Sequence, residues 1–134
     1  MLLPHGTIIA LIDGKSFELF RNAGVEGSPD LHMVAAPRLD AHNHSGASHH
    51  SSAGNKSDSL VAEDAHAIAV VHWLNQEALA HRIPHIVIIA APRTLGELRK
   101  HYHKTLQQAL IGEVAKDLVG RNAQEVLAAL HAGS

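Results

Sequence analysis

The feature that most constrains the fold is a short apolar run near the middle of the chain, His85-Ile86-Val87-Ile88-Ile89-Ala90. It is rich in β-branched side chains, is too short for a typical helix and has no polar alternation. Such a run is typical of a strand that is covered on both faces, as in a parallel sheet. Pro92 ends this strand, because proline has no N–H to offer a neighbouring strand.

The residues that follow predict a basic helix. Thr94 and Glu97 have the spacing of a capping box, in which each side chain accepts a hydrogen bond from the other residue's N–H. The helix should therefore begin at Leu95. Its C-terminal end carries basic residues, where cations suit the helix dipole: Arg99, Lys100, His101, His103 and Lys104. The turn between a strand and a helix is also where open α/β sheets usually bind ligands.

The first third of the chain predicts three strands. Residues 7–12 form an apolar run, and Asp13-Gly14 then predicts a type I′ hairpin turn, whose central residues need positive φ. Residues 17–21 alternate in the manner of a second, antiparallel strand, and residues 22–29 have the composition of a loop. Residues 31–36 can form a third strand, which Pro37 ends or confines to the edge of the sheet.

A long helix is expected before the central strand, with Asp58 or Ser59 as its cap. One face carries apolar residues and a histidine, in the broad stripe expected of a helix on a sheet: Val61, Ala65, Ile68, His72 and Leu79, widened by Val71, Leu74 and Ala78. On this interpretation Trp73 belongs to the core or to the helix–sheet boundary. His72 would be a hydrogen-bonded histidine on the inner face.

The C-terminal third is less clear. Residues 106–115 fit a helix, or a short strand after a helical start, and Asn122 with Glu125 forms a second potential capping box for a final helix. The order β-β-β-α-β-α-(β)-α predicts a single α/β domain over residues 1–134, a mixed β-sheet with helices packed on it.

Composition excludes several classes of function. The formal net charge of −2 gives no global field that would recruit nucleic acid or an anionic membrane, so any basic surface must be local. The absence of cysteine excludes disulfides, thiol catalysis and cysteine-ligated zinc. There is no apolar run of membrane-spanning length and no signal-peptide pattern, so a cytoplasmic protein without membrane partners is expected.

Residues 40–59 differ from the rest of the chain, because they are rich in His, Ser and Gly and offer almost nothing to a core. A loop of this length in a small domain is usually functional or disordered. Its candidate functional residues are His42, His44, His49, His50 and Lys56. Imidazole pairs can bind zinc, nickel or copper, but no ordered element here would fix the geometry. We therefore expect a polar loop, no metal site and no cofactor.

Several motifs, taken together, resemble the bacterial host-attachment protein family, whose members are labelled "protein required for attachment to host cells". The motifs lie between about residue 4 and residue 130: Pro4-His5-Gly6-Thr7, Asp13-Gly14, Leu19-Phe20-Arg21-Asn22, Ala90-Ala91-Pro92-Arg93-Thr94-Leu95-Gly96-Glu97-Leu98-Arg99-Lys100-His101, His103-Lys104 and Lys116-Asp117-Leu118. The stretch over residues 90–104 is the most specific, because many consecutive positions fit in order.

That family in turn looks related to the middle domain of archaeal and eukaryotic peptide-chain release factors. The resemblance implies a ribonuclease H-like α/β sheet. In release factors, the loop between the third strand and the first long helix carries a Gly-Gly-Gln triplet that positions water at the peptidyl-transferase centre. The corresponding loop here, residues 40–59, has Gly46 and Gly54 singly and no glutamine.

Two classes of function follow from the resemblance. The first is a non-catalytic binding or adaptor protein with a role in host attachment. It would associate with the ribosome or other RNA through basic residues that could contact phosphates: Arg93, Arg99, Lys100, His101, His103 and Lys104. The same residues could instead be an ordinary solvated helix face. The second is a divergent ribosome-rescue factor or peptidyl-tRNA hydrolase. The sequence leaves the protein partner and a homo-oligomer open.

Overall fold

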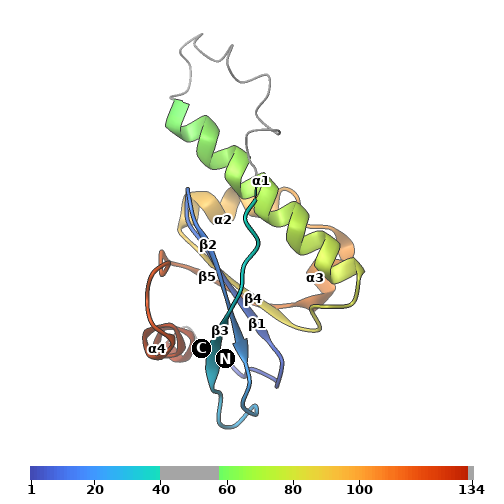
Figure 1. Ribbon diagram of the computed structural model, residues 1–134, viewed down its shortest axis with the longest axis vertical. Coiled ribbons are helices and arrows are strands. Elements are labelled where there is room, and N and C mark those ends of the chain that lie inside the picture. Colours follow the sequence, from blue (N-terminus) through green and yellow to red (C-terminus); the bar gives the residue numbers. More distant parts are fainter. Residues whose placement is uncertain (40–57, 133–134) are drawn as a thin grey trace.

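A computed structural model describes residues 1–39 and 58–132, and its elements form a mixed α/β fold (Figure 1). The strands are β1 (Ile8–Ile12), β2 (Phe17–Asn22), β3 (Leu31–Val34), β4 (Ile86–Ala90) and β5 (Leu110–Ala115). The helices are α1 (Asp58–Leu79), α2 (Pro92–Arg99), α3 (Lys104–Ala109) and α4 (Ala123–Ala132). The predicted fold class is confirmed, although two helices, α2 and α3, stand between β4 and β5.

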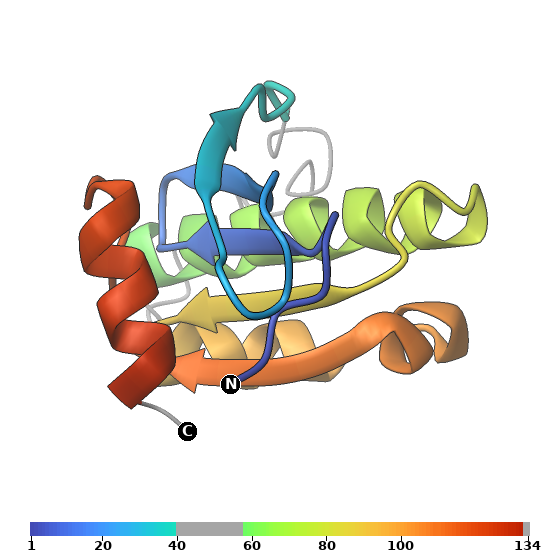
Figure 2. The same cartoon turned by 90° about the horizontal axis from the view of Figure 1, so that it is seen from below.

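The sheet has the strand order β3-β2-β1-β4-β5. β2 is antiparallel to both of its neighbours, whereas β1, β4 and β5 run parallel, as the arrows in Figure 2 show. Ile12 pairs with Ala90, which pairs in turn with Ala115. The three parallel strands therefore end side by side. This is the end of the sheet at which open α/β folds usually bind ligands.

β4 has the buried position that its sequence predicts, because all five of its residues are 0% exposed. Ile86 and Ile88 pack in a core with α1, α2 and α3, while Val87 and Ile89 pack in a second core with α4. Figure 1 shows the corresponding layers, with α1 and α2 on one side of the sheet and α4 on the other.

The start of α2 corrects the sequence prediction. The helix begins at Pro92 and has no side-chain cap, so the capping box at Thr94 does not form. A proline in the first turn needs no N–H partner, and its fixed φ already suits a helix. Thr94 is therefore buried within the helix. The basic segment is also not one helix, because α2 ends at Arg99 and α3 begins at Lys104.

The β1–β2 hairpin is confirmed, but its turn is not type I′. Among the described residues, positive φ occurs at Gly6, His81 and Gly120, and not in the turn. The Asp13 N–H donates to the Ser16 carbonyl at 3.1 Å, and the Asp13 carboxylate accepts from the N–H groups of Lys15 and Ser16. The aspartate side chain thus closes the turn by a route that needs no left-handed glycine.

The buried face of α1 is shifted from the predicted one. His72 and Leu79 are exposed, whereas the core stripe follows helical spacing through Ala67, Val70, Val71, Leu74 and Ala78. Trp73 is half-buried against this core, with its ring edge-on to Phe17 at a centroid distance of 5.6 Å. The prediction for Trp73 is therefore confirmed, whereas the predicted position of His72 on the inner face is wrong.

The ambiguous segment over residues 106–115 is helical to Ala109 and a strand from Leu110. The second capping box forms: the Glu125 N–H donates to Asn122 Oδ1 at 2.9 Å, and the Asn122 N–H donates to Glu125 Oε1 at 3.4 Å. None of the helices in the described part of the chain is both long and apolar enough to cross a membrane.

Candidate nucleic-acid interface

The predicted basic residues lie on α2 and on the segment that follows it, and most of them contact carboxylates. The ion pairs join Arg93 to Asp64 at 2.9 Å, Arg99 to Glu113 at 2.7 Å and Lys100 to Glu97 at 3.1 Å. We call this surface the α2 face and define it by Arg93, Arg99, Lys100, His101, His103 and Lys104. His103 and Lys104 are exposed and have no ion pair with a described residue.

Glu113 is the centre of a hydrogen-bonded cluster on this face. One of its carboxylate oxygens accepts from Arg99 and the other from the Tyr102 hydroxyl at 2.7 Å. Burial opposes ionisation of Glu113, but the hydrogen bonds from Arg99 and Tyr102 outweigh it, so the pKa of Glu113 lies below its usual value. Burial and the Glu113 contact together raise the pKa of Tyr102, which remains a neutral donor. The cluster therefore ties the end of α2 to β5.

Asn75 is a structural residue of this face that the sequence analysis missed. It is 1% exposed, and its side chain donates to the His101 carbonyl at 2.9 Å and accepts from the His103 N–H at 3.0 Å. One amide thus satisfies both backbone groups between α2 and α3. The available signal is a short amide side chain directly after Leu74 of the apolar stripe of α1.

His101 contacts side chains from two helices. Its Nε2 lies 3.3 Å from Glu97 Oε2, and its ring is edge-on to that of His72 at a centroid distance of 6.4 Å. Burial alone would raise the pKa of Glu97, but the hydrogen bonds with Lys100 and His101 prevail and lower it. His101 therefore takes part in a charged cluster within the protein, rather than extending freely towards a ligand.

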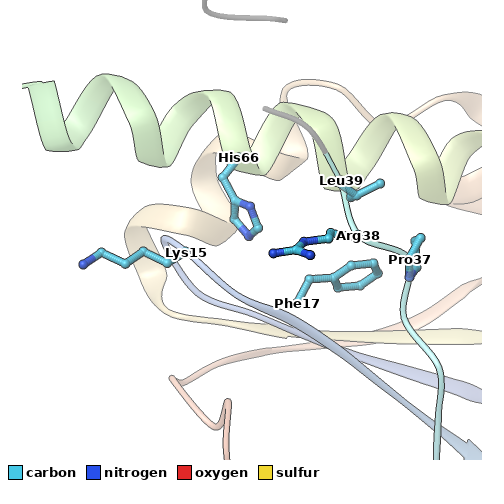
Figure 3. A pocket seen from close by; sticks show the side chains of 6 residues that line it. All are labelled: Lys15, Phe17, Pro37, Arg38, Leu39 and His66. Atoms are coloured by element: carbon cyan, nitrogen blue, oxygen red, sulfur yellow. The ribbon is translucent and has the colours of Figure 1, made fainter. Parts of the chain in front are cut away.

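A second group of basic residues lies elsewhere, around a cavity of about 260 Å³. The cavity is bounded by the β1–β2 turn, the segment after β3 and α1, as Figure 3 shows, and its lining residues are Lys15, Phe17, Pro37, Arg38, Leu39 and His66. We call it the Arg38 pocket. These residues carry no signal in the sequence that marks them as a site, because they come from three segments and none belongs to a recognisable motif.

The Arg38 pocket is held in shape by contacts between α1 and the turn. The His66 Nε2 lies 3.0 Å from the Ser16 carbonyl, so this ring nitrogen is the donor, because a carbonyl only accepts. At Gly14, a Cβ would lie 2.6 Å from the Cγ of Glu63, so glycine lets α1 approach closely. The Arg38 side chain extends between the rings of His66 and Phe17 (Figure 3).

The candidate loop residues His42, His44, His49, His50 and Lys56 lie outside the described residues, so their roles stay predictions. Within the described ranges, no group of three or more His, Asp or Glu side chains could hold a metal ion.

Comparison with protein families assigns the chain. A family model described as "Bacterial archaeo-eukaryotic release factor family 12" matches residues 6–130. The chain belongs to this release-factor family. The release-factor part of the predicted resemblance is therefore confirmed, whereas host attachment has no support in the match. No curated protein matches the chain significantly.

The matched range of this release-factor family member includes β1 to β5 and ends within α4. Both basic regions, the α2 face and the Arg38 pocket, therefore belong to the family domain and not to an appended segment.

Proposed function

We propose that this protein is a ribosome-binding member of the release-factor family that does not itself release peptides. The observation that carries the proposal is the family match over residues 6–130, since it makes the whole domain release-factor-like. In release factors, the loop that corresponds to the connection between β3 and α1 carries the Gly-Gly-Gln triplet. Here residues 40–57, in that connection, contain no glutamine. This composition supports binding without hydrolysis.

The α2 face is one candidate for the RNA contact. Its four Lys and Arg side chains are accompanied by three carboxylates, so its local excess of positive charge is small. The side chains of Arg99 and Lys100 are 56% and 69% exposed, so they can exchange a carboxylate for an RNA phosphate. Because few counterions would be released in that exchange, we propose a modest and salt-sensitive interaction.

Co-sedimentation with purified ribosomes tests the proposal. The parent protein should pellet with ribosomes at low salt and return to the supernatant as salt rises. Arg99→Glu with Lys100→Glu should reduce the pelleted fraction. The matched control is Lys116→Glu with Arg121→Glu, which makes the same charge change at exposed positions outside the α2 face. If the parent never pellets with ribosomes, the proposed function is wrong.

A peptidyl-tRNA release assay on the same ribosomes separates binding from catalysis. The expected result is no release above background. Release by the parent protein would replace the binding proposal with the ribosome-rescue or hydrolase alternative. On the binding proposal, the host-attachment role that the resemblance implies would be an indirect consequence of ribosome association.

A further inference from the structure

We propose that the Arg38 pocket binds one nucleotide, with Arg38 holding its phosphate, Lys15 adding positive charge at the rim and Phe17 contacting its base. This inference goes beyond ribosome binding and names a ligand of single-nucleotide size. The nucleotide could be free in solution or could belong to an RNA chain, and both sources share the chemistry of a phosphate next to an aromatic ring.

The charge of the pocket supports a phosphate ligand. Among the described residues, no carboxylate lines the cavity or forms an ion pair with Lys15 or Arg38. Four other arginines of the described chain have carboxylate partners, namely Arg82, Arg93, Arg99 and Arg121, whereas Arg21, like Arg38, has no ion pair with a described residue. The planar guanidinium fork of Arg38 matches two oxygens of a phosphate. The Lys15 side chain points away from Arg38 (Figure 3), so it adds positive charge at the rim rather than a direct contact.

The aromatic wall supports a base beside that phosphate. The Phe17 ring lies next to the Arg38 guanidinium in the pocket (Figure 3), and its edge-on contact with Trp73 fixes its orientation. Nucleobases stack on such rings with little dependence on sequence. Pro37 and Leu39 extend the apolar part of the lining.

The position and size of the pocket limit the ligand. Lys15 lies in the turn that follows β1 and Phe17 begins β2, at the end of the sheet where the parallel strands finish. The volume of about 260 Å³ is slightly below the usual range of roughly 300–1,000 Å³ for ligand pockets. A single nucleotide therefore suits the pocket better than a dinucleotide cofactor. The hydrogen bond from His66 to Ser16 keeps the opposite wall in place before any ligand binds.

Calorimetric titration with adenosine monophosphate, inorganic phosphate and adenosine tests this inference without ribosomes, so it can fail independently of the proposed function. We expect the monophosphate to bind more tightly than either of its parts. Arg38→Glu should weaken its binding by about tenfold or more, because a bidentate charged contact becomes a repulsion. Phe17→Leu should weaken the binding of the monophosphate but leave the binding of inorganic phosphate unchanged. The control is Lys116→Glu, which also replaces one positive charge by one negative charge, at an exposed lysine outside the pocket. It should bind the monophosphate as the parent does.

A short single-stranded RNA forms the second arm of the titration. Tighter binding of RNA than of the monophosphate, lost in Arg38→Glu, supports the pocket and assigns the nucleotide to an RNA chain. If the RNA and the monophosphate bind with equal affinity, the pocket contacts one nucleotide only, which supports the pocket and a free nucleotide as its ligand. The inference is overturned if the monophosphate gives no heat at millimolar concentration, or if a folded Arg38→Glu protein binds it as the parent does.

Discussion

The α2 face and the Arg38 pocket contain the same kinds of basic residue but differ in what surrounds them. On the α2 face, Arg93, Arg99 and Lys100 each contact a carboxylate of the protein. In the pocket, Lys15 and Arg38 have no such partner among the described residues. A run of basic residues in a sequence therefore shows only how much positive charge is present. An anionic ligand is attracted by the part of that charge that carboxylates of the protein do not already neutralise.

Asn75→Ala should have the largest effect, because it tests whether the α2 face is chiefly structural. The change leaves the His101 carbonyl and the His103 N–H without their partner, which should lower the free energy of unfolding by about 2–3 kcal/mol. Urea denaturation measures this difference. Gln76→Ala, at the adjacent exposed position of α1, is the control and should change it by less than about 0.5 kcal/mol. A loss as small for Asn75→Ala would mean that this amide does not hold the α2–α3 connection.

Lys15→Glu with Arg38→Glu sharpens the same comparison from the side of binding. This variant should weaken adenosine monophosphate binding by more than about tenfold, a difference of about 1.4 kcal/mol, while Arg99→Glu with Lys100→Glu should change it by less than about twofold. Both variants reverse two charges, so net charge cannot explain the difference. Equal losses in the calorimetric titration would show that the two regions act only through the overall field.

Glu113→Gln tests the cluster on the α2 face through its pH dependence. The pKa of Glu113 in the folded protein is lower than its ordinary 4.5, so its charge stabilises the fold fully above pH 4.5. That contribution is lost as the pH falls through the lower folded value. The variant should be less stable than the parent by about 1 kcal/mol at neutral pH and equally stable in acid.

Chemical denaturation across this pH range gives the comparison for Glu113→Gln, and Glu26→Gln, at an exposed position, is its control. A stability difference between the parent and Glu113→Gln that persists in strong acid would indicate lost packing rather than lost charge.

Local patterns predicted the fold well where neighbours along the chain decide the structure. The apolar run of β4 spans five residues, and Asn122 and Glu125 are three positions apart; both predictions are confirmed. The same capping pattern failed at Thr94 because Pro92 already starts the helix. A local pattern is therefore decisive only where no stronger local signal competes with it.

The sites were harder to predict, because their geometry depends on distant residues. Arg93 pairs with Asp64 across 29 positions and Arg99 with Glu113 across 14, so the sequence did not reveal that the α2 face is largely neutralised. The Arg38 pocket gathers residues from a turn, a segment after an edge strand and a helix. The pairing of β2 with both β1 and β3 places the turn beside the segment after β3, and His66 of α1 contacts the turn at Ser16.

Gly14→Ala should have the smallest effect, and it tests how the turn that carries Lys15 is closed. If the Asp13 carboxylate closes the turn, position 14 needs no positive φ and alanine can occupy it. The new Cβ must displace the Glu63 side chain, while the unfolded chain loses entropy, so the two effects should cancel to within about 0.5 kcal/mol in urea denaturation. Gly27→Ala, where a Cβ meets no atom, is the control. A type I′ turn would instead strain alanine at this position, and a loss well above about 1 kcal/mol would favour it over the aspartate-closed turn.

Because His66, and not Glu63, lines the Arg38 pocket, the variant should also bind adenosine monophosphate as the parent does. Unchanged stability together with unchanged binding would show that neither the turn nor the pocket needs the conformational freedom of a glycine at position 14.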